Sequence, residues 1–327
     1  MGDVAMIVPV LRALNNQYPE VKITVLTRAF FAPFFRDLKY VSIYKADVKG
    51  RHKGVHGLYK LSKELKLLSV DAVADLHNVL RSNLLKLFFV GTPFFQINKG
   101  RAKKKALTTG KDFKQLKTTH QRYADVFEKL GFTLSLKNPV FPEKAKLDSY
   151  ISEVIDSNSK PMIGIAPFAA FKSKAYPIAL MEEVIKDLSK EYKILLFGGG
   201  KKETVILNQI ADKNKNTINL AGKLNLNQEL DVISNLKVMI AMDSGNAHMA
   251  AMLGTQVVTL WGVTHPYAGF YPFNQNPDNA LLANQTKYPK IPTSIYGNKY
   301  PEGYEDAIAS ITPKQVVEKT LKVIKKA

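Results

Sequence analysis

Residues 238–266 constrain the fold more than any other part of this sequence. They read VMIAMDSGNAHMAAMLGTQVVTLWGVTHP. A β-prone apolar run at 238–242 ends at the turn signature Asp-Ser-Gly, and a compact helical stretch then runs to Gly254. A second β-prone run at 256–261 completes a parallel β–α–β unit. The loop before the helix presents backbone N–H groups outside the carboxyl end of a strand, which is where doubly wound sheets bind phosphate.

The same alternation of strands and helices predicts two α/β halves. In the first half, after an opening loop and helix, strands are expected at 21–26, 40–44, 70–76 and 93–97, and helices at 57–68, 79–89 and 120–130. A helix at 145–156 is expected to bridge the two halves. In the second half, strands are expected at 162–166, 192–197 and 217–220 before the 238–266 unit, and helices at 177–189, 201–213, 228–235 and 313–326.

This pattern is typical of two Rossmann-like domains that face a cleft. The expected N-terminal domain covers residues 1–157 and forms the acceptor side of the cleft. The expected second domain covers residues 158–311 and binds the nucleotide-sugar donor. Residues 312–327 are expected to form a C-terminal helix that packs back toward the N-terminal domain.

Composition limits the class of protein further. The chain has 327 residues and no cysteine, which excludes a disulfide framework and a cysteine zinc site. No stretch reaches the ~18 uncharged apolar residues that a membrane span needs. No secretory signal is found, so we expect a cytoplasmic protein.

The charge is strongly basic. Lys and Arg number 47 against 28 acids, a net charge of +19, and residues 99–122 are the densest part, with Asp112 as their only acid. Such a surface favours an anionic partner such as lipid headgroups or a phosphorylated substrate. The alternative is a solubilising lysine-rich surface. Nucleic acid is disfavoured because no RNA-binding aromatic signature or DNA-reading helix accompanies the charge.

Five short motifs occur in this chain, each of them once. They are Gly-Asp-Val with a Val-Pro-x-Leu-x-Ala-Leu helix at 2–14, Lys-x-Tyr-Pro at 174–177, Asp-Ser-Gly-x-x-His-x-x-Ala-x-x-Gly at 243–254, Gly-x-Thr-x-Pro at 262–266 and Ser-Ile-Thr-Pro at 310–313. With these motifs the chain resembles glycosyltransferase family 9, the bacterial heptosyltransferases of lipopolysaccharide inner-core synthesis.

The resemblance implies a GT-B fold and a membrane-peripheral enzyme at the inner face of the membrane. It implies inverting, metal-independent transfer from a nucleotide-diphospho-sugar, typically ADP-heptose, to an anionic lipid-linked saccharide. The nucleotide-sugar would be a substrate, so neither a cofactor nor a metal site is expected.

Inverting transfer needs a general base and stabilisation of the leaving diphosphate. Asp3 is the candidate base, because the family's base occupies this position; spacing alone favours a helix N-cap. Lys174 is the candidate cation for the diphosphate, with Lys172 as a neighbour that shares the role. The alternative for either lysine is an ordinary solvated side chain.

The donor phosphates are expected at the Asp-Ser-Gly helix. The backbone N–H groups of Ser244, Gly245 and Asn246 are expected to donate hydrogen bonds to these phosphates. A bare carboxylate at Asp243 would repel a diphosphate, so Asp243 is expected to cap the helix or to orient Lys174 or His248. His248 is interpreted as a hydrogen-bond donor on the phosphate side, and its alternative is a structural histidine.

Other site residues follow from the resemblance. Glu203 is expected to accept hydrogen bonds from the ribose hydroxyls, or simply to be a first-turn acid favoured by the helix dipole. Thr264 and His265 are expected to border the donor, and Met242 either flanks the base ring or belongs to the core. The acceptor-side candidates are Arg81, Ser82, His120 and Arg122.

The chain departs from the family pattern in two places. Family members carry a β-strand before the Gly-Asp-Val loop, and none precedes it here, so we expect that the true product has a further N-terminal segment and that Met1 is an internal methionine. A gap is then expected between the strands at 21–26 and 70–76. Residues 285–304 also lack the cysteines that many relatives carry there.

Other functions remain open at this level. The main alternative is a catalytically impaired GT-B-like protein that binds nucleotide-sugars or polyanions; a sugar-nucleotide epimerase of the same fold is a third. A nicotinamide dehydrogenase is disfavoured because residues 198–200 lack the Gly-x-Gly-x-x-Gly spacing. The sequence names neither the sugar, the nucleotide base, the acceptor nor the oligomeric state.

Overall fold

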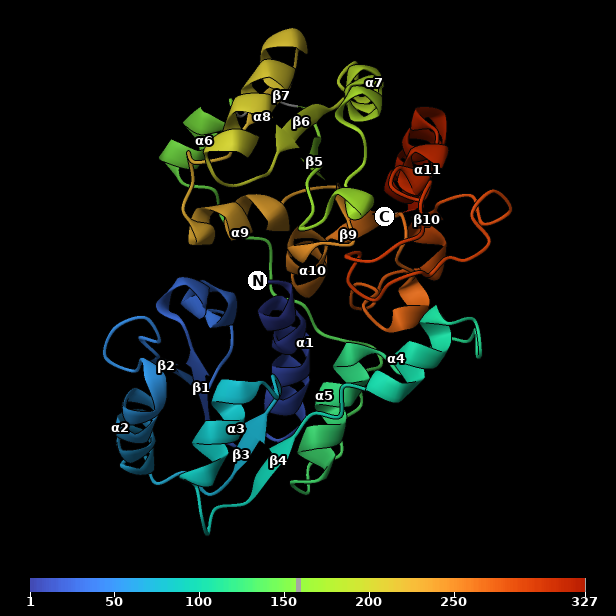
Figure 1. Cartoon of the computed structure of the whole chain (residues 1–327). Coiled ribbons are helices and arrows are strands. Elements are labelled where there is room, and N and C mark those ends of the chain that lie inside the picture. The colour runs from blue at the N-terminus through green and yellow to red at the C-terminus, as the bar shows by residue number, and fades with distance from the viewer. Residues whose placement is uncertain (157–159, 327) are drawn as a thin grey trace. The chain divides into compact units, whose positions relative to one another are not determined.

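The computed structural model describes residues 1–156 and 160–326, in two compact units that are described one at a time (Figure 1). The N-terminal unit comprises Met1, Asp3–Lys99 and Thr119–Val140. The C-terminal unit comprises Gly2, Gly100–Thr118 and Phe141–Ala327. The boundary expected after Ser157 lies outside the described residues.

The connecting segment belongs to the C-terminal unit from Phe141 onward. The ring of Phe141 lies 6.3 Å from that of Phe273, and a Cβ at Gly254 would come within 2.8 Å of it. Because these contacts join Phe141 to the second unit, the division falls earlier in the chain than the sequence predicts. Of the helix expected at 145–156, only α6(Ser149–Val154) is helical, capped by the Asp148 carboxylate on the Ile151 N–H.

The N-terminal unit contains two parallel pairs of strands. One pair is β1(Ile23–Thr27) with β2(Val41–Lys45), and the other is β3(Val73–Asp75) with β4(Phe94–Gln96). These pairs form separate sheets, which is the separation between β1 and β3 that the sequence predicts. Each strand lies within three residues of its expected bounds.

Helices cover these strands. They are α1(Gly2–Gln17), η1(Ala29–Phe35), α2(Gly54–Lys66), α3(Leu80–Leu87) and α5(Thr119–Glu128). The period of apolar residues in α2 brings Leu58, Leu61 and Leu65 into one cluster with Leu85 and Phe89. The sequence did not predict the short η1 turn, whose aromatic run has no helical period.

The C-terminal unit is built on one six-stranded parallel sheet with the order β10-β9-β8-β5-β6-β7. Its strands are β5(Met162–Ala166), β6(Lys193–Leu196), β7(Thr217–Asn219), β8(Val238–Met242), β9(Gln256–Trp261) and β10(Ala280–Leu282). The chain reverses direction across the sheet between β5 and β8, which is the switch point of a doubly wound fold. The sequence did not predict β10, which is only three residues long and is defined by its pairing with β9.

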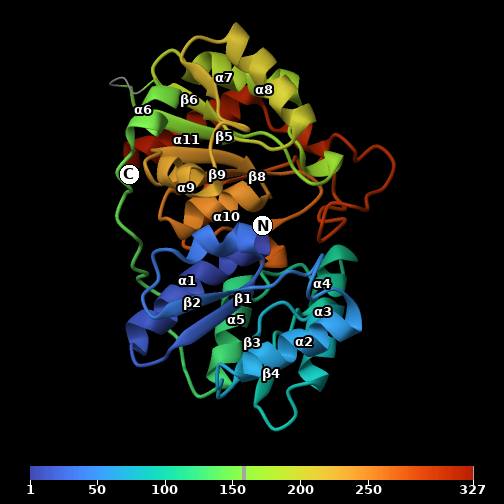
Figure 2. The same ribbon diagram turned by 90° about the vertical axis from the view of Figure 1, so that its left-hand side faces the viewer.

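Helices lie on both faces of this sheet (Figure 2). One face packs on α7(Ile178–Leu188), α8(Lys201–Lys213) and α11(Pro313–Lys326), and the other on α9(Leu226–Ser234) and α10(Gly245–Met252). Because both faces are covered, every residue of β8 is buried, and its sequence reads as a continuous apolar run rather than an alternating one.

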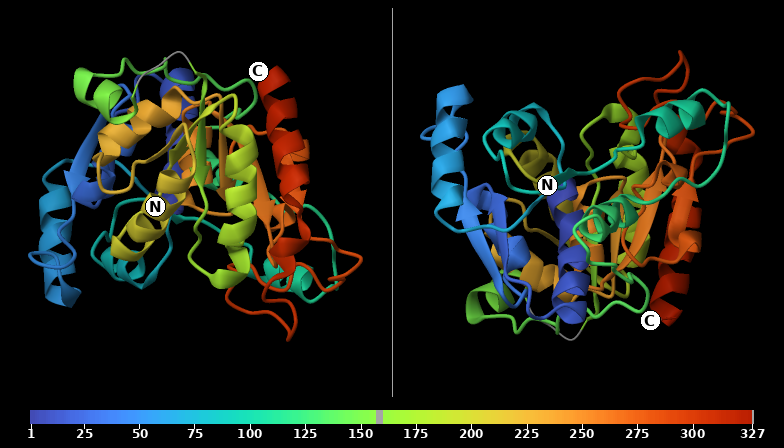
Figure 3. Two further views of the ribbon diagram at one scale, coloured as in Figure 1. Left: turned by 90° about the horizontal axis from the view of Figure 1, so that it is seen from above. Right: turned by 90° about the horizontal axis from the view of Figure 1, so that it is seen from below.

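The last helix was expected to pack toward the N-terminal domain, and that expectation stays a prediction. Helix α11 packs on α7 and on β8 and β9, within the C-terminal unit (Figure 3). Val316 and Val323 enter the same core as Val184 of α7. The period of apolar residues in α11 defines a buried stripe but does not identify the surface that the stripe meets.

The densely basic stretch contributes a further helix, α4(Arg101–Thr108). Leu107 is buried, and Lys104 lies with its ammonium 4.0 Å from the centroid of the Phe270 ring. Lys103, Lys105 and Lys111 are exposed. Among the described residues, no helix combines the length and apolarity that crossing a bilayer requires.

Candidate active site

The centre of the site is an ion pair at the carboxyl edge of the C-terminal sheet. The Nζ atom of Lys174 lies 2.8 Å from Oδ2 of Asp243, with side-chain exposures of 12% and 8%. Lys174 ends η2(Lys172–Lys174), after β5, and Asp243 directly follows β8. Strands β5 and β8 are parallel neighbours, so the loops after them meet at one edge.

A third strand adds a hydroxyl to this ion pair. Thr264, in the loop after β9, is 1% exposed, and its Oγ1 donates to the same Oδ2 of Asp243 at 3.0 Å. One carboxylate oxygen of Asp243 therefore contacts both the Lys174 ammonium and the Thr264 hydroxyl. Of its two expected roles, the structure shows orientation of Lys174, because Asp243 does not cap α10.

The N-terminus of α10 lies directly after Asp243. Ser244 is the N-cap residue, but its side chain makes no capping hydrogen bond, and its buried Oγ has no hydrogen-bond partner among the described residues. The first N–H groups of a helix have no intrahelical acceptor. Gly245 and Asn246 are partly exposed, and His248 is 6% exposed in the first turn. This end of the helix thus offers donors to an anion.

Two glycines hold the lysine-bearing turn in place. A Cβ at Gly262 would lie 2.3 Å from the Ser173 carbonyl oxygen, and one at Gly297 would lie 2.5 Å from Cδ of Lys174. The Ser173 hydroxyl donates to the carbonyl of Gly297, whose φ is +85°. Residues 285–304 therefore contact the stem of Lys174. The sequence did not identify Ser173 or Gly297, because only the tertiary contact distinguishes them.

Tyr176 anchors the other end of the Lys-x-Tyr-Pro motif. Its hydroxyl donates to the Ile311 carbonyl at 2.7 Å, and burial, with a smaller effect of the Glu183 charge, raises its pKa to about 12. Its backbone N–H donates to Sδ of Met242 at 3.3 Å. Met242 has no exposed surface and lies in the hydrophobic core. It therefore cannot contact a base ring in this conformation, and of its two expected roles the structure shows the core one.

Lys172 and Lys174 differ sharply although they share one turn. The Lys172 side chain is 77% exposed, and its ammonium lies 3.6 Å from Oδ1 of Asp306. It therefore does not join Lys174 at Asp243. Glu203, in the first turn of α8, accepts the Gly199 N–H on Oε2 at 2.7 Å, so this carboxylate closes the glycine-rich loop.

His265 is a buried neutral imidazole. It is 3% exposed, and burial lowers its pKa to about 4. Its Nδ1 accepts the Tyr267 N–H at 3.1 Å, and its ring contacts those of Tyr267 and Phe113. His265 thereby caps the turn that follows Thr264.

The proposed general base lies in the N-terminal unit. Asp3 is exposed in the first turn of α1, not in a loop before it, because the helix begins at Gly2. No side chain caps α1, so Asp3 is not the N-cap that its spacing favours. The buried Tyr123 hydroxyl donates to the Asp3 carbonyl at 3.3 Å, and burial, followed by the Asp3 charge, raises the pKa of Tyr123.

The acceptor-side candidates do not form one cluster of exposed groups. Arg81 is exposed, whereas the Ser82 hydroxyl accepts the Val79 N–H at 2.9 Å and so caps α3. His120 and Arg122 are 3% and 6% exposed. Arg122 donates to the Asn98 carbonyl at 3.1 Å, and burial lowers its pKa. Ser82 and Arg122 therefore have structural contacts that the sequence did not predict.

A carboxylate that the sequence did not identify lies at the end of β3. Asp75 is 7% exposed; its Oδ1 accepts the N–H groups of His77 and Asn78, and its Oδ2 accepts Nε2 of Gln96 at 2.9 Å. These bonds make Asp75 the organiser of the loop before α3.

Comparison with known proteins now identifies the class. Residues 58–298 match the model of glycosyltransferase family 9 (heptosyltransferase), and the chain belongs to this family of enzymes. It is 26% identical to lipooligosaccharide heptosyltransferase 2 of Haemophilus influenzae, over all of this chain and 97% of that protein.

Solved structures share the fold. The glycosyl transferase family 9 protein from Veillonella parvula has a TM-score of 0.75 and 18% identity, covering 100% of this chain and 95% of that one. The Escherichia coli ADP-heptose lps heptosyltransferase II has a TM-score of 0.71 and 23% identity, covering 99% and 96%. The predicted GT-B class is confirmed by these neighbours.

Proposed function

We propose that this enzyme transfers a heptosyl group from ADP-heptose to a lipopolysaccharide-core acceptor, with inversion at the anomeric carbon and without a metal ion. The observation that carries the proposal is the Lys174–Asp243–Thr264 cluster beside the N-terminus of α10. The names of the relatives, lipooligosaccharide heptosyltransferase 2 and ADP-heptose lps heptosyltransferase II, support the sugar, the nucleotide and the acceptor.

In the proposed reaction, Asp3 removes the proton from the acceptor hydroxyl. The hydroxyl oxygen forms a bond to the anomeric carbon on the face opposite the diphosphate, and the bond from that carbon to the diphosphate oxygen breaks. ADP leaves with the bonding electron pair, and the proton on Asp3 passes to solvent. A base in this role typically contributes a factor of about 10²–10⁴ in rate.

Lys174 and the α10 N-terminus stabilise the leaving ADP in this scheme. An ammonium has three N–H donors, and Asp243 takes one of them, which leaves two for the diphosphate. The backbone N–H groups at Gly245 and Asn246, with the Ser244 hydroxyl, add neutral donors and the positive end of the helix dipole. Asp243 thus serves as a positioning residue for Lys174.

The other donor-side residues have narrower proposed roles. Glu203 accepts the ribose hydroxyls on the carboxylate oxygen that Gly199 does not occupy. His248 donates to a phosphate oxygen. Thr264 keeps the Asp243 carboxylate in place. No cofactor is needed, because the nucleotide-sugar brings the activated bond.

We place the reaction at the inner face of the membrane, with the enzyme in peripheral contact. The support is the exposed basic surface of α4 and the loop after it, because anionic headgroups attract such surfaces by ~1 kcal/mol per Lys or Arg.

Calorimetry with ADP-, GDP-, UDP- and dTDP-sugars tests the donor, and transfer to a heptose-deficient lipopolysaccharide core with excess chelator tests the reaction. We expect ADP-heptose to bind more tightly than the other nucleotide-sugars. We also expect the enzyme to turn over in the presence of chelator and to give a product whose anomeric configuration, measured by NMR, is inverted. Turnover lost in chelator and restored by a divalent cation would contradict the metal-independent step. Donor binding without any transfer would favour the alternative, a catalytically impaired nucleotide-sugar binder.

A further inference from the structure

Residues 100–118 belong to the C-terminal unit, although the residues on either side of them, Lys99 and Thr119, belong to the N-terminal unit. We call residues 100–118 the strap. Its first part is α4, and Figure 1 shows α4 beside η3(Pro266–Ala268), the short turn that comes after β9. The strap has no part in the reaction proposed above, yet it contacts the residues that directly follow Thr264.

Buried apolar side chains fasten the strap to this turn. Leu107 and Leu116 of the strap form one cluster with Ala268, and their exposures are 1%, 4% and 1%. The ring of Tyr267 packs against the same cluster. Because removal of these side chains from water is favourable, the strap and the turn are held together by a small hydrophobic core of their own.

Polar and backbone contacts fix the strap more closely. The Leu116 N–H donates to the Tyr267 carbonyl at 2.9 Å. A Cβ at Gly269 would lie 2.7 Å from the Lys117 carbonyl oxygen, so the two backbones approach each other there without a side chain between them. The position of the turn is therefore set jointly by β9, which precedes it, and by the strap, which packs on it.

Phe113 brings the strap into contact with His265, the next residue after Thr264. The centroid of the Phe113 ring lies 5.2 Å from that of His265 in an edge contact, and 5.1 Å from that of Tyr267. Contacts of this geometry orient the rings that make them. The orientation matters because Nδ1 of His265 accepts the Tyr267 N–H and so closes the turn.

The turn in its own place determines how Thr264 enters the site. The Thr264 hydroxyl donates to Oδ2 of Asp243 at 3.0 Å, and the same oxygen lies 2.8 Å from Nζ of Lys174. A hydrogen bond weakens steeply as its angle departs from linearity, so a small shift of the Thr264 backbone would loosen the carboxylate. Packed contacts therefore run without a break from Phe113 to the ion pair.

We propose that Phe113 is a positioning residue for the transfer reaction. Through the turn after Thr264, the strap keeps the Asp243 carboxylate in place and so directs Lys174 at the donor diphosphate. The inference rests on the proposed function, because that function assigns Lys174 to the diphosphate. Phe113 is 49% exposed, so its ring can be removed with little loss of buried surface, and its effect on catalysis can be measured in a folded protein.

Steady-state kinetics of the full chain provide the first test. Phe113→Ala should lower kcat by about three- to tenfold, the size of effect expected for one lost aromatic pair, and leave the acceptor KM within about twofold of the parent value. Phe113→Tyr keeps the ring and should restore kcat to within about twofold. A rise in the acceptor KM with kcat unchanged would overturn the proposal, because it would place Phe113 at the acceptor.

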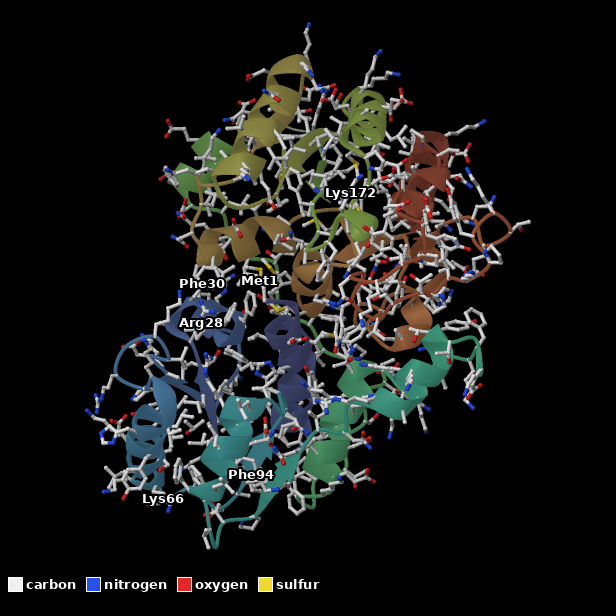
Figure 4. The ribbon with its side chains drawn as sticks, in the orientation of Figure 1. Met1, Arg28, Phe30, Lys66, Phe94 and Lys172 are labelled. Carbon is white, nitrogen blue, oxygen red and sulfur yellow. The ribbon has the colours of Figure 1, made fainter. Side chains whose placement is uncertain are left out.

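Tyr59→Ala is the matched control. Tyr59 is 44% exposed and meets the Phe88 ring edge-on at 5.5 Å. It lies on α2 of the N-terminal unit, the helix whose last residue, Lys66, is labelled in Figure 4. Its kcat should stay within about twofold of the parent value. Equal losses of kcat in Tyr59→Ala and Phe113→Ala would show a general effect of ring removal and would overturn the assignment.

A double-mutant cycle with Thr264→Val tests the route of the effect. This variant removes the hydroxyl that holds Asp243. If Phe113 acts through that hydroxyl, Phe113→Ala should cost no more than about 1.5-fold in kcat once Thr264 is already Val, because the two changes then remove the same interaction. The same loss of kcat in both backgrounds would show that Phe113 acts independently of Thr264.

Hydrogen exchange of the donor-free protein, measured by mass spectrometry, tests the positioning apart from the chemistry. The amides of residues 262–270 should exchange several-fold faster in Phe113→Ala than in the parent, whereas those of β6 should not change. Unchanged exchange at 262–270 would overturn the proposal. If exchange rises there but the parent protein neither binds an ADP-sugar nor transfers a heptosyl group, the proposed function fails while the strap still positions the turn.

Discussion

Asp243 and Lys174 form an ion pair of 2.8 Å with little access to solvent. A carboxylate at the N-terminus of a helix would compete with a diphosphate for the same donors. Here its charge is committed to Lys174 and its Oδ2 also accepts the Thr264 hydroxyl. Removal of one partner of such a pair leaves an uncompensated buried charge, so the two residues act as a unit.

Replacement of Lys174 by Met should reduce kcat/KM for transfer by about 10²–10³, because a preorganised donor to the leaving group is lost. Lys172→Met is the matched control, since Lys172 lies two residues earlier in the same turn but is 77% exposed. Its kcat/KM should stay within about threefold of the parent value. Steady-state assays with ADP-heptose provide the measurement, and similar losses in both variants would contradict the assignment to Lys174.

Asp3→Asn should lower kcat by about 10²–10⁴ and leave the donor Kd unchanged, because the amide cannot accept the acceptor proton. Asp71→Asn, at another exposed acid of the N-terminal unit, is the control. Single-turnover kinetics with calorimetry of donor binding separate the two quantities. Full activity of Asp3→Asn would exclude Asp3 as the base.

Gly262→Ala should destabilise the protein by about 1–3 kcal/mol, because its Cβ would lie 2.3 Å from the Ser173 carbonyl oxygen. Since Ser173 adjoins Lys174, transfer should fall as well. In contrast, a Cβ at Gly199 meets nothing within 4 Å, so Gly199→Ala should stay within about 0.5 kcal/mol of the parent in urea unfolding. Equal stability of the two variants would show that the contact at Gly262 relaxes without cost.

Because of His265, the free energy of unfolding should fall as the pH is lowered. Burial lowers its pKa from 6.5 to about 4, so the folded state favours the neutral ring. That stabilisation is fully present above the unfolded pKa and is lost as the pH falls from 6.5 through about 4. Between pH 8 and pH 5 the loss should be on the order of 1–2 kcal/mol.

The variant His265→Asn keeps a side-chain acceptor for the Tyr267 N–H but does not titrate. Urea unfolding at several pH values should therefore show a flatter profile for His265→Asn than for the parent. Parallel profiles for the two proteins would assign the acid sensitivity to other groups.

Lys103→Gln/Lys105→Gln/Lys111→Gln should weaken binding to phosphatidylglycerol vesicles, because each lysine near an anionic surface contributes ~1 kcal/mol. The same change at the exposed Lys322, Lys325 and Lys326 of α11 is the control. Vesicle co-sedimentation at low and physiological salt measures both. Equal losses in the two triple variants would mean that net charge, not the α4 surface, drives the contact.

Much of the fold follows from local patterns. Helices α8 and α11 have the predicted bounds, and β8 and β9 are the predicted strands. Each depends on the periodicity of apolar residues and on nearby turn residues, which a sequence displays directly. The three-residue strand β10 and the packing of α11 depend on distant partners, and these the sequence did not predict.

The candidate site divides in the same way. The motifs that the chain shares with the family identified Lys174, Asp243 and Thr264 separately. The sequence did not predict that Asp243 joins the other two through a single oxygen, and it left open whether Met242 flanks the base ring or belongs to the core.

The sequence by itself determined the alternation of strands and helices and the edge of the sheet at which the polar motifs fall. The tertiary structure alone decided which side chains pair there, since Ser173 with Gly297 and Gly262 with the Ser173 carbonyl lie far apart in the chain. Strand periodicity acts over a few residues, whereas the approach of two loops depends on the packing of the whole sheet. Steric fit at these glycines therefore sets the position of Lys174.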